Sequence, residues 1–337
     1  MHLPSILAEK RLIPDSLIRI GIRQQLKKHS KHLQNESKST EDWIKSLSNS
    51  PIAEATEISK IQHYEIPTDY FKYSLGPQLK YSSCYWETPH STLPEAEESM
   101  LMKSAKHAKL YNGQSILELG CGWGSFSLWM AEHYPESNIT CMSHSKTQKE
   151  FIDSVVKRRN LKNITVITCD INEFQTEKKY DRIVSIEMFE HLRNHSKLFL
   201  RLSKWLQEDG LIFVHIFAHK NANYLFQVEH ERDWMAQYFF TGGMMPSVEL
   251  LPKSAHDFNL ENTWLINGNH YSKTLEAWLR IQDSNEPIIL EIFKKAYGKD
   301  AKLWLQRWRI FYLACSELFS FNNGSEWFVM HYLFSKK

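Results

Sequence analysis

The chain has 337 residues, of which 42% are hydrophobic and 13% aromatic, and its formal net charge at pH 7 is +2. This apolar fraction is ample for a buried core and argues against a wholly disordered chain. The near balance of charge gives no electrostatic case for a nucleic-acid partner. The length allows about two domain-sized units, or one large domain with insertions.

The five cysteines are odd in number and show no CxxC spacing. This pattern argues against a disulfide framework or a structural zinc site, so we expect no metal and a reducing compartment. No signal peptide is predicted at the start, and no apolar run approaches the roughly 18 residues that span a bilayer. We therefore expect a cytoplasmic protein, either soluble or peripheral to a membrane.

The first 60 residues are polar and helix-prone, and four basic residues recur every four positions, namely Arg19, Arg23, Lys27 and Lys31. On a helix these side chains form one stripe. The stripe either faces solvent, as on an ordinary helix, or lies on an anionic membrane surface.

From about residue 100, apolar runs of strand length alternate with stretches of helical periodicity. The predicted strands are 115–119, 139–142, 164–168, 182–186 and 211–217, and the predicted helices are 95–110, 125–133, 146–159 and 198–206. Apolar strands separated by helices indicate an α/β fold with a parallel sheet covered on both faces. Two later runs, 262–266 and 327–334, are expected to complete the edge of the sheet.

The first strand leads into a glycine-rich turn that contains Gly120 and Gly122 and follows Glu118. Glycines at alternate positions let the backbone turn sharply and approach a ligand. A carboxylate beside backbone N–H groups suits a ligand that ends in an amino acid, which is the shape of S-adenosylmethionine. A purely structural turn is the alternative.

The next two strands also end in polar residues. Ser143 and Gln148 follow the second strand and are able to hydrogen-bond ribose hydroxyls. Asp170 follows the third strand, where it either accepts from an adenine amino group or caps a helix.

Three separated motifs carry a family resemblance: ELGCGWGS (118–125), DRIVSIEMFEH (181–191) and HYEIPTDYF (63–71). Together they resemble the cyclopropane-fatty-acyl-phospholipid synthase family, and within it the branch of plant coclaurine-type N-methyltransferases. The likeness runs from about residue 60 to the C-terminus and includes YSSCYW (81–86), FFTGGMMP (239–246) and NGNHY (267–271).

The resemblance implies a class I methyltransferase fold, a doubly wound and mostly parallel sheet, with S-adenosylmethionine as methyl donor. It divides the chain into a helical segment (1–60), a donor-binding Rossmann-like core (61–220), and cap helices with the final strands (221–337). The residues implied to bind the donor are Tyr81, Ser82, Glu118, Gly120, Gly122, Ser143, Gln148, Asp170 and Ile171.

The stretch after the fourth predicted strand carries Glu187, Glu190 and His191. If a helical turn begins there, this spacing places all three on one face. An alkylamine with a pKa of about 10 is mostly protonated at neutral pH and must lose a proton before it accepts a methyl group. Two carboxylates and an imidazole suit that task. We therefore expect these three residues to be catalytic and the acceptor to be a small amine with an aromatic or apolar body.

The first alternative is cyclopropane-fatty-acyl-phospholipid synthesis on an unsaturated acyl chain, with some contact with the membrane. The resemblance implies that this branch uses a bound bicarbonate, in a site matched here by Ile186, Glu190, His215 and Tyr271. Glu187 departs from that branch, which usually has a small residue there. The alternative interpretation is that His215 and Tyr271 are ordinary core residues with satisfied hydrogen bonds.

Five aromatic residues are candidates for an acceptor wall: Trp234, Phe239, Phe240, Trp264 and Trp327. A donor-binding protein without catalytic activity is the second alternative function. A homodimer is compatible with the sequence.

Overall fold

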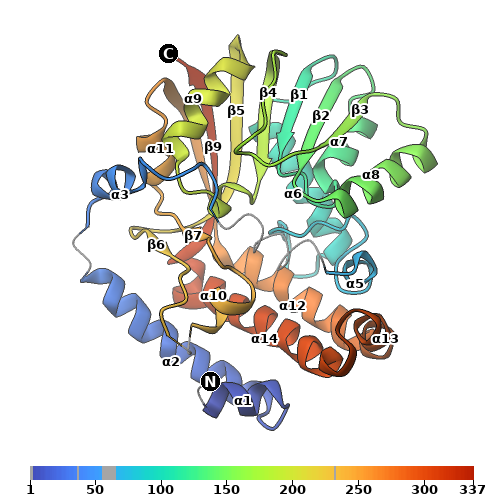
Figure 1. The fold of residues 1–337 in the computed structure, drawn as a ribbon, viewed down its shortest axis with the longest axis vertical. Coiled ribbons are helices and arrows are strands. Elements are labelled where there is room, and N and C mark those ends of the chain that lie inside the picture. The colour runs from blue at the N-terminus through green and yellow to red at the C-terminus, as the bar shows by residue number, and fades with distance from the viewer. Residues whose placement is uncertain (1–2, 36–37, 55–65, 231–232) are drawn as a thin grey trace.

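The computed structural model describes residues 3–35, 38–54, 66–230 and 233–337. In Figure 1 a twisted sheet with helices on both faces lies above a separate layer of helices. Both chain ends contribute helices to this lower layer. The first three residues of the predicted motif at 63–71 lie outside the described residues.

The main sheet has seven strands in the order β3-β2-β1-β4-β5-β9-β8. The strands are β1 (Ser115–Leu119), β2 (Asn138–Ser143), β3 (Ile164–Thr168), β4 (Tyr180–Ile186), β5 (Leu206–His219), β8 (Phe258–Ile266) and β9 (Trp327–Lys336). Strands β1 to β5 pair in parallel, whereas β9 is antiparallel to both β5 and β8. The mostly parallel sheet and its late edge strands are thus confirmed. Two short strands, β6 (Tyr224–Leu225) and β7 (Met244–Met245), form a separate ribbon.

Alternate side chains of the central strands are buried on opposite faces of the sheet. On one face Ile116 and Val184 pack with residues of α6 (Leu93–His107) and α7 (Ser125–His133). Helix α8 (Lys146–Arg159) packs against β2 and β3. On the other face Leu117 and Ile183 pack with α9 (His195–Trp205) and α11 (Leu250–Ser254). This two-sided burial explains why the central strands are apolar almost throughout.

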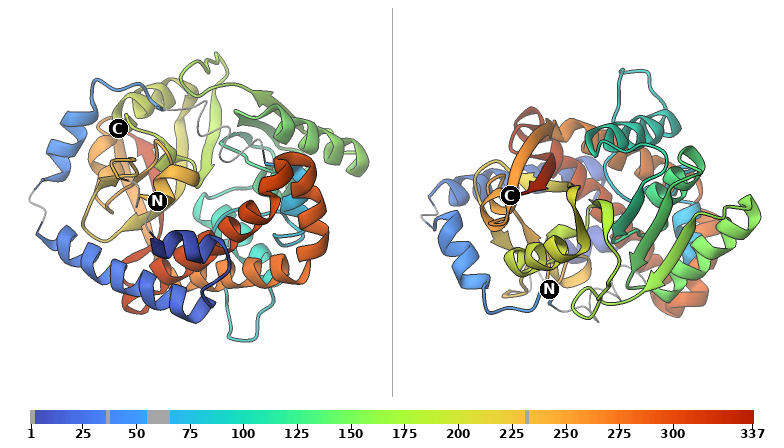
Figure 2. Two further views of the ribbon diagram at one scale, coloured as in Figure 1. Left: turned by 60° about the horizontal axis from the view of Figure 1, so that its bottom comes forward. Right: turned by 90° about the horizontal axis from the view of Figure 1, so that it is seen from above.

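The lower layer of helices is built from segments far apart in sequence, as Figures 1 and 2 show. It contains α1 (Leu3–Glu9), α2 (Asp15–Gln34), α5 (Thr68–Lys72), α12 (Gly268–Ser284), α13 (Glu286–Tyr297) and α14 (Ala301–Ser320). Helix α10 (Trp234–Tyr238) lies beside this layer, where Trp234 Nε1 donates to Glu9 of α1 at 2.8 Å. Helix α3 (Thr40–Leu47) and the 3₁₀ turn η1 (Phe189–His191) lie elsewhere. Two further 3₁₀ turns, η2 (Gly298–Asp300) and η3 (Phe321–Gly324), flank α14. The predicted domain boundaries at 60 and 220 stay predictions.

The basic stripe of α2 is divided between two environments. Arg19 bonds to Glu276 Oε1 at 2.7 Å and to Glu317 Oε1 at 3.0 Å. Arg23 bonds to the same Glu317 at 2.5 Å, whereas Lys27 and Lys31 are exposed. The expectation of a stripe that faces solvent or lipid along its whole length is wrong at Arg19, which is half-buried against α12 and α14, whereas Arg23 is exposed like Lys27 and Lys31.

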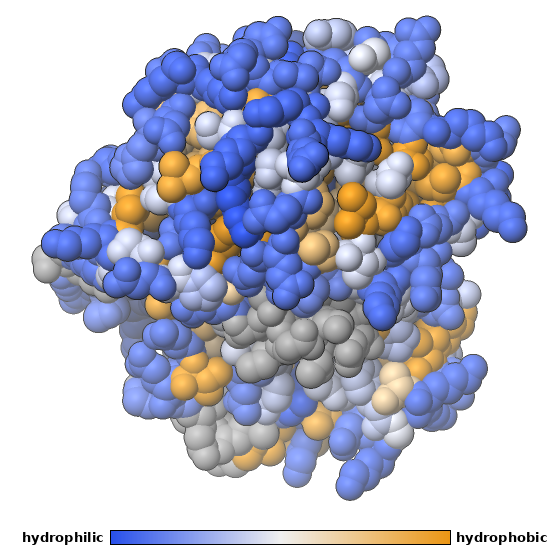
Figure 3. Space-filling view, turned by 45° about the horizontal axis from the view of Figure 1, so that its top comes forward, coloured by the Kyte–Doolittle hydropathy of each residue, from blue (hydrophilic) through white to orange (hydrophobic). Residues whose placement is uncertain are grey.

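The surface seen in Figure 3 is mainly hydrophilic, and its hydrophobic residues lie in separate groups. Within the described ranges, no helix combines the length and apolar character needed to cross a bilayer.

Candidate active site

A cavity of about 240 Å³ lies between the carboxyl ends of the parallel strands and the lower layer of helices. Residues that follow β1, β2, β3 and β4 line its sheet side, and residues of α12 and α14 line its other side. Ligand sites of open α/β sheets lie at this edge. All residues predicted to bind the donor, to be catalytic or to form the anion site line this cavity except His215.

The glycine-rich turn forms one wall of the cavity. Gly120 has φ +75°, and a Cβ at this position would lie 2.5 Å from Cγ of Met188. Gly122 has φ +51°, and a Cβ there would meet no atom within 4 Å. The positive angles and the close approach to Met188 require glycine, while the space beside Gly122 leaves the backbone open to a ligand.

Glu118 lies beneath this turn and accepts a hydrogen bond from the hydroxyl of Ser127. Its side chain is buried, and burial raises its pKa to about 7. The hydrogen bond from Ser127 and the charge of Lys80 oppose this shift. A buried carboxylate beside an open backbone turn fits the amino acid end of S-adenosylmethionine.

The polar residues after β2 and β3 line the same end of the cavity. Ser143 donates to Oε1 of Gln148 at 2.5 Å, and both side chains are buried. Asp170 accepts from the backbone N–H of Asn172 at 2.7 Å and begins a turn, so the helix-cap alternative is wrong. The buried side chain of Ile171 lines the cavity next to it.

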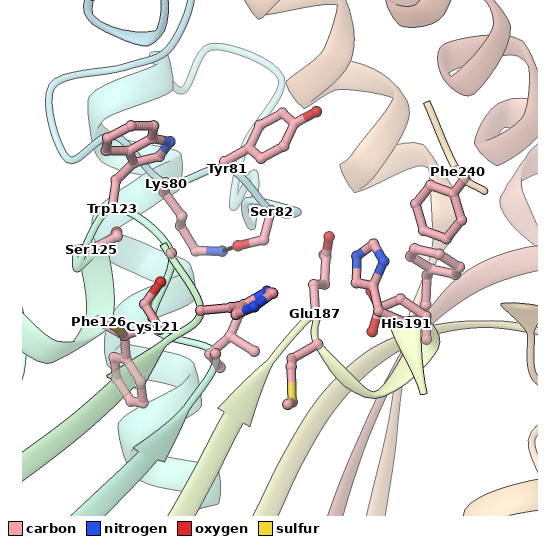
Figure 4. A pocket seen from close by; sticks show the side chains of 18 of the residues that line it. Lys80, Tyr81, Ser82, Cys121, Trp123, Ser125, Phe126, Glu187, His191 and Phe240 are labelled. Carbon is pink, nitrogen blue, oxygen red and sulfur yellow. Dashed lines mark hydrogen bonds between the residues drawn. The ribbon is translucent and has the colours of Figure 1, made fainter. Parts of the chain in front are cut away.

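The segment before α6 approaches the cavity from the side of the helical layer, where Figure 4 shows Lys80, Tyr81 and Ser82. The Tyr81 ring packs 5.6 Å from that of Trp278 on α12. Lys80 is buried and donates to Ser82 Oγ at 2.5 Å and to the carbonyl of Ser83 at 2.6 Å. Burial lowers the pKa of Lys80. No sequence pattern singled out this lysine, although it directly precedes the Tyr-Ser motif.

Glu187 follows β4 and adopts a left-handed backbone with φ +47°. The assumed helical turn is therefore wrong at this residue, because a helix requires negative φ. Its carboxylate accepts from the backbone N–H of Ser83 at 2.8 Å and from the Tyr271 hydroxyl at 2.5 Å. It also lies 3.1 Å from Nε2 of His215. Burial raises the pKa of Glu187, while Lys80 and the hydrogen bonds lower it.

These donors form a cradle around one carboxylate. Two of them come from His215 and Tyr271, which the resemblance assigns to a bicarbonate site. Ile186 precedes Glu187 and pairs with His215 across β4 and β5. Because the cradle holds the side chain of this chain's own Glu187, His215 and Tyr271 are already in use.

Glu190 and His191 belong to η1 and line the cavity beside Glu187. Glu190 is buried, and its Oε2 has no hydrogen-bond partner among the described residues. Burial and the nearby charge of Glu187 raise the pKa of Glu190 well above its usual range. The His191 ring stacks on Phe240, with centroids 4.7 Å apart, as Figure 4 shows.

The aromatic wall of the cavity differs from the expected one. Of the five predicted residues only Phe240 lines it. Phe239 and Trp327 are fully buried elsewhere in the core, and Trp234 donates from Nε1 to Glu9 of α1 at 2.8 Å. Trp264 stacks instead on His107, away from the cavity. The aromatic residues that line it are Trp123, Phe217, Phe226, Trp278, Phe311 and Phe319, besides Tyr81, Phe126, Phe240 and Tyr271.

The sequence model of a family described as mycolic acid cyclopropane synthetase matches residues 52–326. The chain belongs to this family. Among its relatives, (S)-coclaurine N-methyltransferase from Thalictrum flavum subsp. glaucum is 37% identical, over 98% of this chain and 94% of the relative. The predicted family and the predicted class of S-adenosylmethionine-dependent methyltransferase are confirmed.

Solved structures of this family are similar throughout the fold. A coclaurine N-methyltransferase bound to N-methylheliamine and SAH is 33% identical, with a TM-score of 0.94 over 98% of both chains. A cyclopropane synthase from Mycobacterium tuberculosis is 22% identical, with a TM-score of 0.71 over 83% of this chain and 98% of the other. The predicted class I methyltransferase fold is confirmed.

Proposed function

We propose that this methyltransferase methylates the nitrogen of a small amine that carries an aromatic or apolar body. The observation that carries this proposal is the Glu187 carboxylate inside the cradle of Ser83, His215 and Tyr271. A protein carboxylate there supplies a fixed base and a negative charge, which suit a cationic amine. The many N-methyltransferases among the relatives support the same choice.

The donor is held, in this proposal, along the carboxyl ends of β1, β2 and β3. Glu118 faces its ammonium group, the turn at Gly120 and Gly122 follows its amino acid end, and Ser143 with Gln148 faces the ribose. Asp170 and Ile171 then lie beside the adenine. S-adenosylmethionine supplies a methyl group on a sulfonium, which a free amine lone pair displaces directly.

The acceptor is bound next to Glu187, Glu190 and His191. Glu190 attracts the protonated amine through its unpartnered oxygen, and Glu187 takes the amine's proton and frees the nitrogen lone pair. The aromatic wall supports the cationic product through its ring faces. His191, stacked on Phe240, bounds the polar side of this acceptor space.

The lipid alternative is less well supported by the same geometry. A bicarbonate would need the donors that Glu187 already uses. Two buried carboxylates beside an acyl chain would also be costly, because an unpaired charge in apolar surroundings is strongly disfavoured.

The deciding experiment offers isotopically labelled S-adenosylmethionine together with two acceptor pools, namely assorted secondary and tertiary amines and liposomes of unsaturated phospholipid. Mass spectrometry then locates the label. Label in amines alone is the expected result. Label in the acyl chains would contradict the amine proposal, and an enzyme that labels neither pool would contradict both acceptor classes.

Donor binding is expected to release about half a proton at pH 7, because a carboxyl with a pKa near 7 is half protonated there and ionises beside a cation. The group responsible is Glu118, with a pKa of about 7. Donor affinity should fall toward pH 5, where Glu118 must first ionise. Near pH 9 release should give way to proton uptake, because Glu118 is already charged there and the donor's α-amino group, with a pKa of about 8, must gain a proton to bind as an ammonium. Calorimetry of donor binding in buffers with different ionisation enthalpies measures the released protons.

The matched control for this measurement is Glu97, another buried carboxyl whose pKa burial raises to about 7. It does not line the cavity, since it accepts from the backbone N–H groups of Gln78 and Lys80. Glu118→Gln should remove the released protons and Glu97→Gln should keep them. Equal release from both variants would exclude Glu118 from the donor site.

A further inference from the structure

Lys80 places a buried cationic side chain at the edge of the active site. It belongs to the segment before α6, lines the cavity and is only 2% exposed. Its Nζ donates to Ser82 Oγ at 2.5 Å and to the carbonyl of Ser83 at 2.6 Å, and Figure 4 shows the side chain pointing toward Ser82. The two bonds hold the backbone at Ser82 and Ser83 against the lysine.

Ser83 connects Lys80 with the predicted base. Its carbonyl accepts from Lys80, while its backbone N–H donates to Oε1 of Glu187 at 2.8 Å. Loss of the lysine would release one side of Ser83 and with it the N–H that orients the Glu187 carboxylate. Lys80 therefore influences the position of Glu187 although the two residues are more than 100 positions apart.

The titratable groups around Glu187 come from distant parts of the chain. They are Lys80 and Cys84 before α6, Glu190 and His191 of η1, His215 of β5, Tyr271 of α12 and Cys315 of α14. Burial raises the pKa of both thiols, of the Tyr271 phenol and of Glu190, and it lowers that of His215. These five groups are uncharged at neutral pH, so none of them supplies a charge that favours the ionised form of Glu187.

Lys80 supplies such a charge. Burial lowers its pKa, but its two oxygen acceptors and the carboxyls of Glu97, Glu118 and Glu187 favour the ammonium. Burial raises the pKa of Glu187, and the charge of Lys80 is the largest influence that opposes this rise. A buried carboxyl without a cation nearby stays protonated and is unable to take a proton from an amine.

We propose that Lys80 is a positioning residue for proton removal, which keeps the Glu187 carboxylate ionised and holds the Ser83 N–H against it. This inference rests on the proposed amine methylation. The step itself moves one proton from the amine nitrogen to an oxygen of Glu187 and leaves the lone pair on nitrogen for the donor's methyl group. Lys80 acts through Glu187 and exchanges no proton with the acceptor.

The charge of Lys80 has a purpose before the acceptor binds. A carboxyl that relied on the amine's own charge would ionise only after binding. A fixed ammonium instead prepares the base in the free enzyme, so that no reorganisation is needed when the amine arrives. The ionisation state of Glu187 without acceptor is therefore the property to measure.

The test replaces Lys80 by methionine, which has a similar length but neither a charge nor an N–H group. Lys80→Gln is the second variant, because its amide still donates to an oxygen but carries no charge. Arg182→Met is the matched control. Arg182 is another buried cation that donates to a backbone carbonyl, that of Ala108 at 3.1 Å, and it does not line the cavity.

Two measurements are made on each folded variant. The first is the pH profile of kcat with an alkylamine at saturating donor concentration. The second is infrared difference spectroscopy without donor or acceptor, in which each variant is compared with the same variant carrying Glu187→Gln. The difference isolates the carbonyl band of a protonated Glu187 carboxyl.

Both Lys80 variants are expected to show the protonated Glu187 band at pH 7, whereas the wild type and Arg182→Met should not. The acid limb of their pH profile should move upward by about one to three pH units, the usual effect of one nearby opposite charge. Above the shifted limb, kcat should approach that of the wild type, because Glu187 then ionises without help. An uncharged arylamine needs no base and should keep the wild-type pH dependence.

The outcomes separate the two proposals. An enzyme that methylates amines, with an acid limb in the Lys80 variants that coincides with that of Arg182→Met, would overturn the role of Lys80 alone. An equal loss of kcat at every pH, or a protonated Glu187 band in the wild type at pH 7, would also overturn it. A wild-type enzyme that methylates no amine would overturn the proposed function, and the infrared band would still decide whether Lys80 keeps Glu187 ionised.

Discussion

Replacing Glu187 by glycine is expected to lower amine methylation about 10²- to 10⁴-fold, the usual contribution of a positioned base, and formate is expected to restore part of it. The backbone should tolerate this change, because φ is +47° and glycine adopts that region without strain. The variant keeps the three donors of the cradle, contributed by Ser83, His215 and Tyr271. A small carboxylate from solution is therefore able to occupy the space of the lost side chain. Rates are measured against formate concentration, with donor affinity determined separately.

Glu187→Gln provides the comparison for this rescue. Glutamine fills the cradle but presents an NH₂ group where the carboxylate accepted a hydrogen bond, and it is not a base at neutral pH. We expect it to be as inactive as the glycine variant and insensitive to formate. An unchanged amine rate in Glu187→Gly would remove Glu187 from the mechanism. Equal responses of both variants to formate would show that formate acts elsewhere.

The sheet was predictable because local patterns determine most of its elements. The bounds 115–119, 146–159 and 164–168 agree with the structure, since apolar runs and helical periodicity begin and end there together. Strand β5 begins at Leu206, before the predicted start at 211. The prediction missed this extension because the residues directly after Leu206 are polar and exposed. No apolar pattern marks such an extension, which follows from pairing with β4.

The active site was only partly predictable, because its decisive contacts join distant segments. The composition of the 187–191 stretch indicated acid–base chemistry, but the left-handed backbone of Glu187 has no signal in the local sequence. The carboxylate of Glu187 accepts from the backbone N–H of Ser83, and no local pattern in either segment predicts this contact. The aromatic wall likewise depends on which ring of α14 or β5 faces the cavity, which tertiary packing decides.

The environment of the basic stripe on α2 was also unpredictable because it depends on contacts between distant segments. A regular spacing of Arg19 and Arg23 predicts a common helix face but not what covers that face. Their partner Glu317 lies on α14, almost 300 positions away, and is itself buried. Burial of that carboxylate with two guanidinium groups satisfies its charge, whereas the sequence alone shows only a basic helix.

Glu190→Gln is expected to raise the KM for an alkylammonium acceptor roughly 10- to 100-fold, which corresponds to the loss of about 1.5–3 kcal/mol from one charged hydrogen bond. The affected atom is Oε2 of Glu190, which is buried and has no partner in the described part of the chain. An uncharged arylamine of similar shape should show little change in KM. A similar loss for both acceptors would mean that Glu190 shapes the pocket without pairing with the cation.

Although Glu190→Gln should weaken acceptor binding, we expect the same substitution to raise the stability of the folded protein. Because burial and Glu187 raise the folded-state pKa of Glu190, its carboxyl is increasingly destabilising as pH rises above the unfolded-state value of about 4.3. Glutamine has no such cost, so the thermal midpoint of Glu190→Gln should exceed that of the wild type by a margin that grows from pH 5 to pH 8. Thermal unfolding without ligands measures this margin. A variant that is more stable yet binds the cation less tightly would identify Glu190 as a residue retained for the acceptor, whereas a loss of stability at all pH values would assign it to packing.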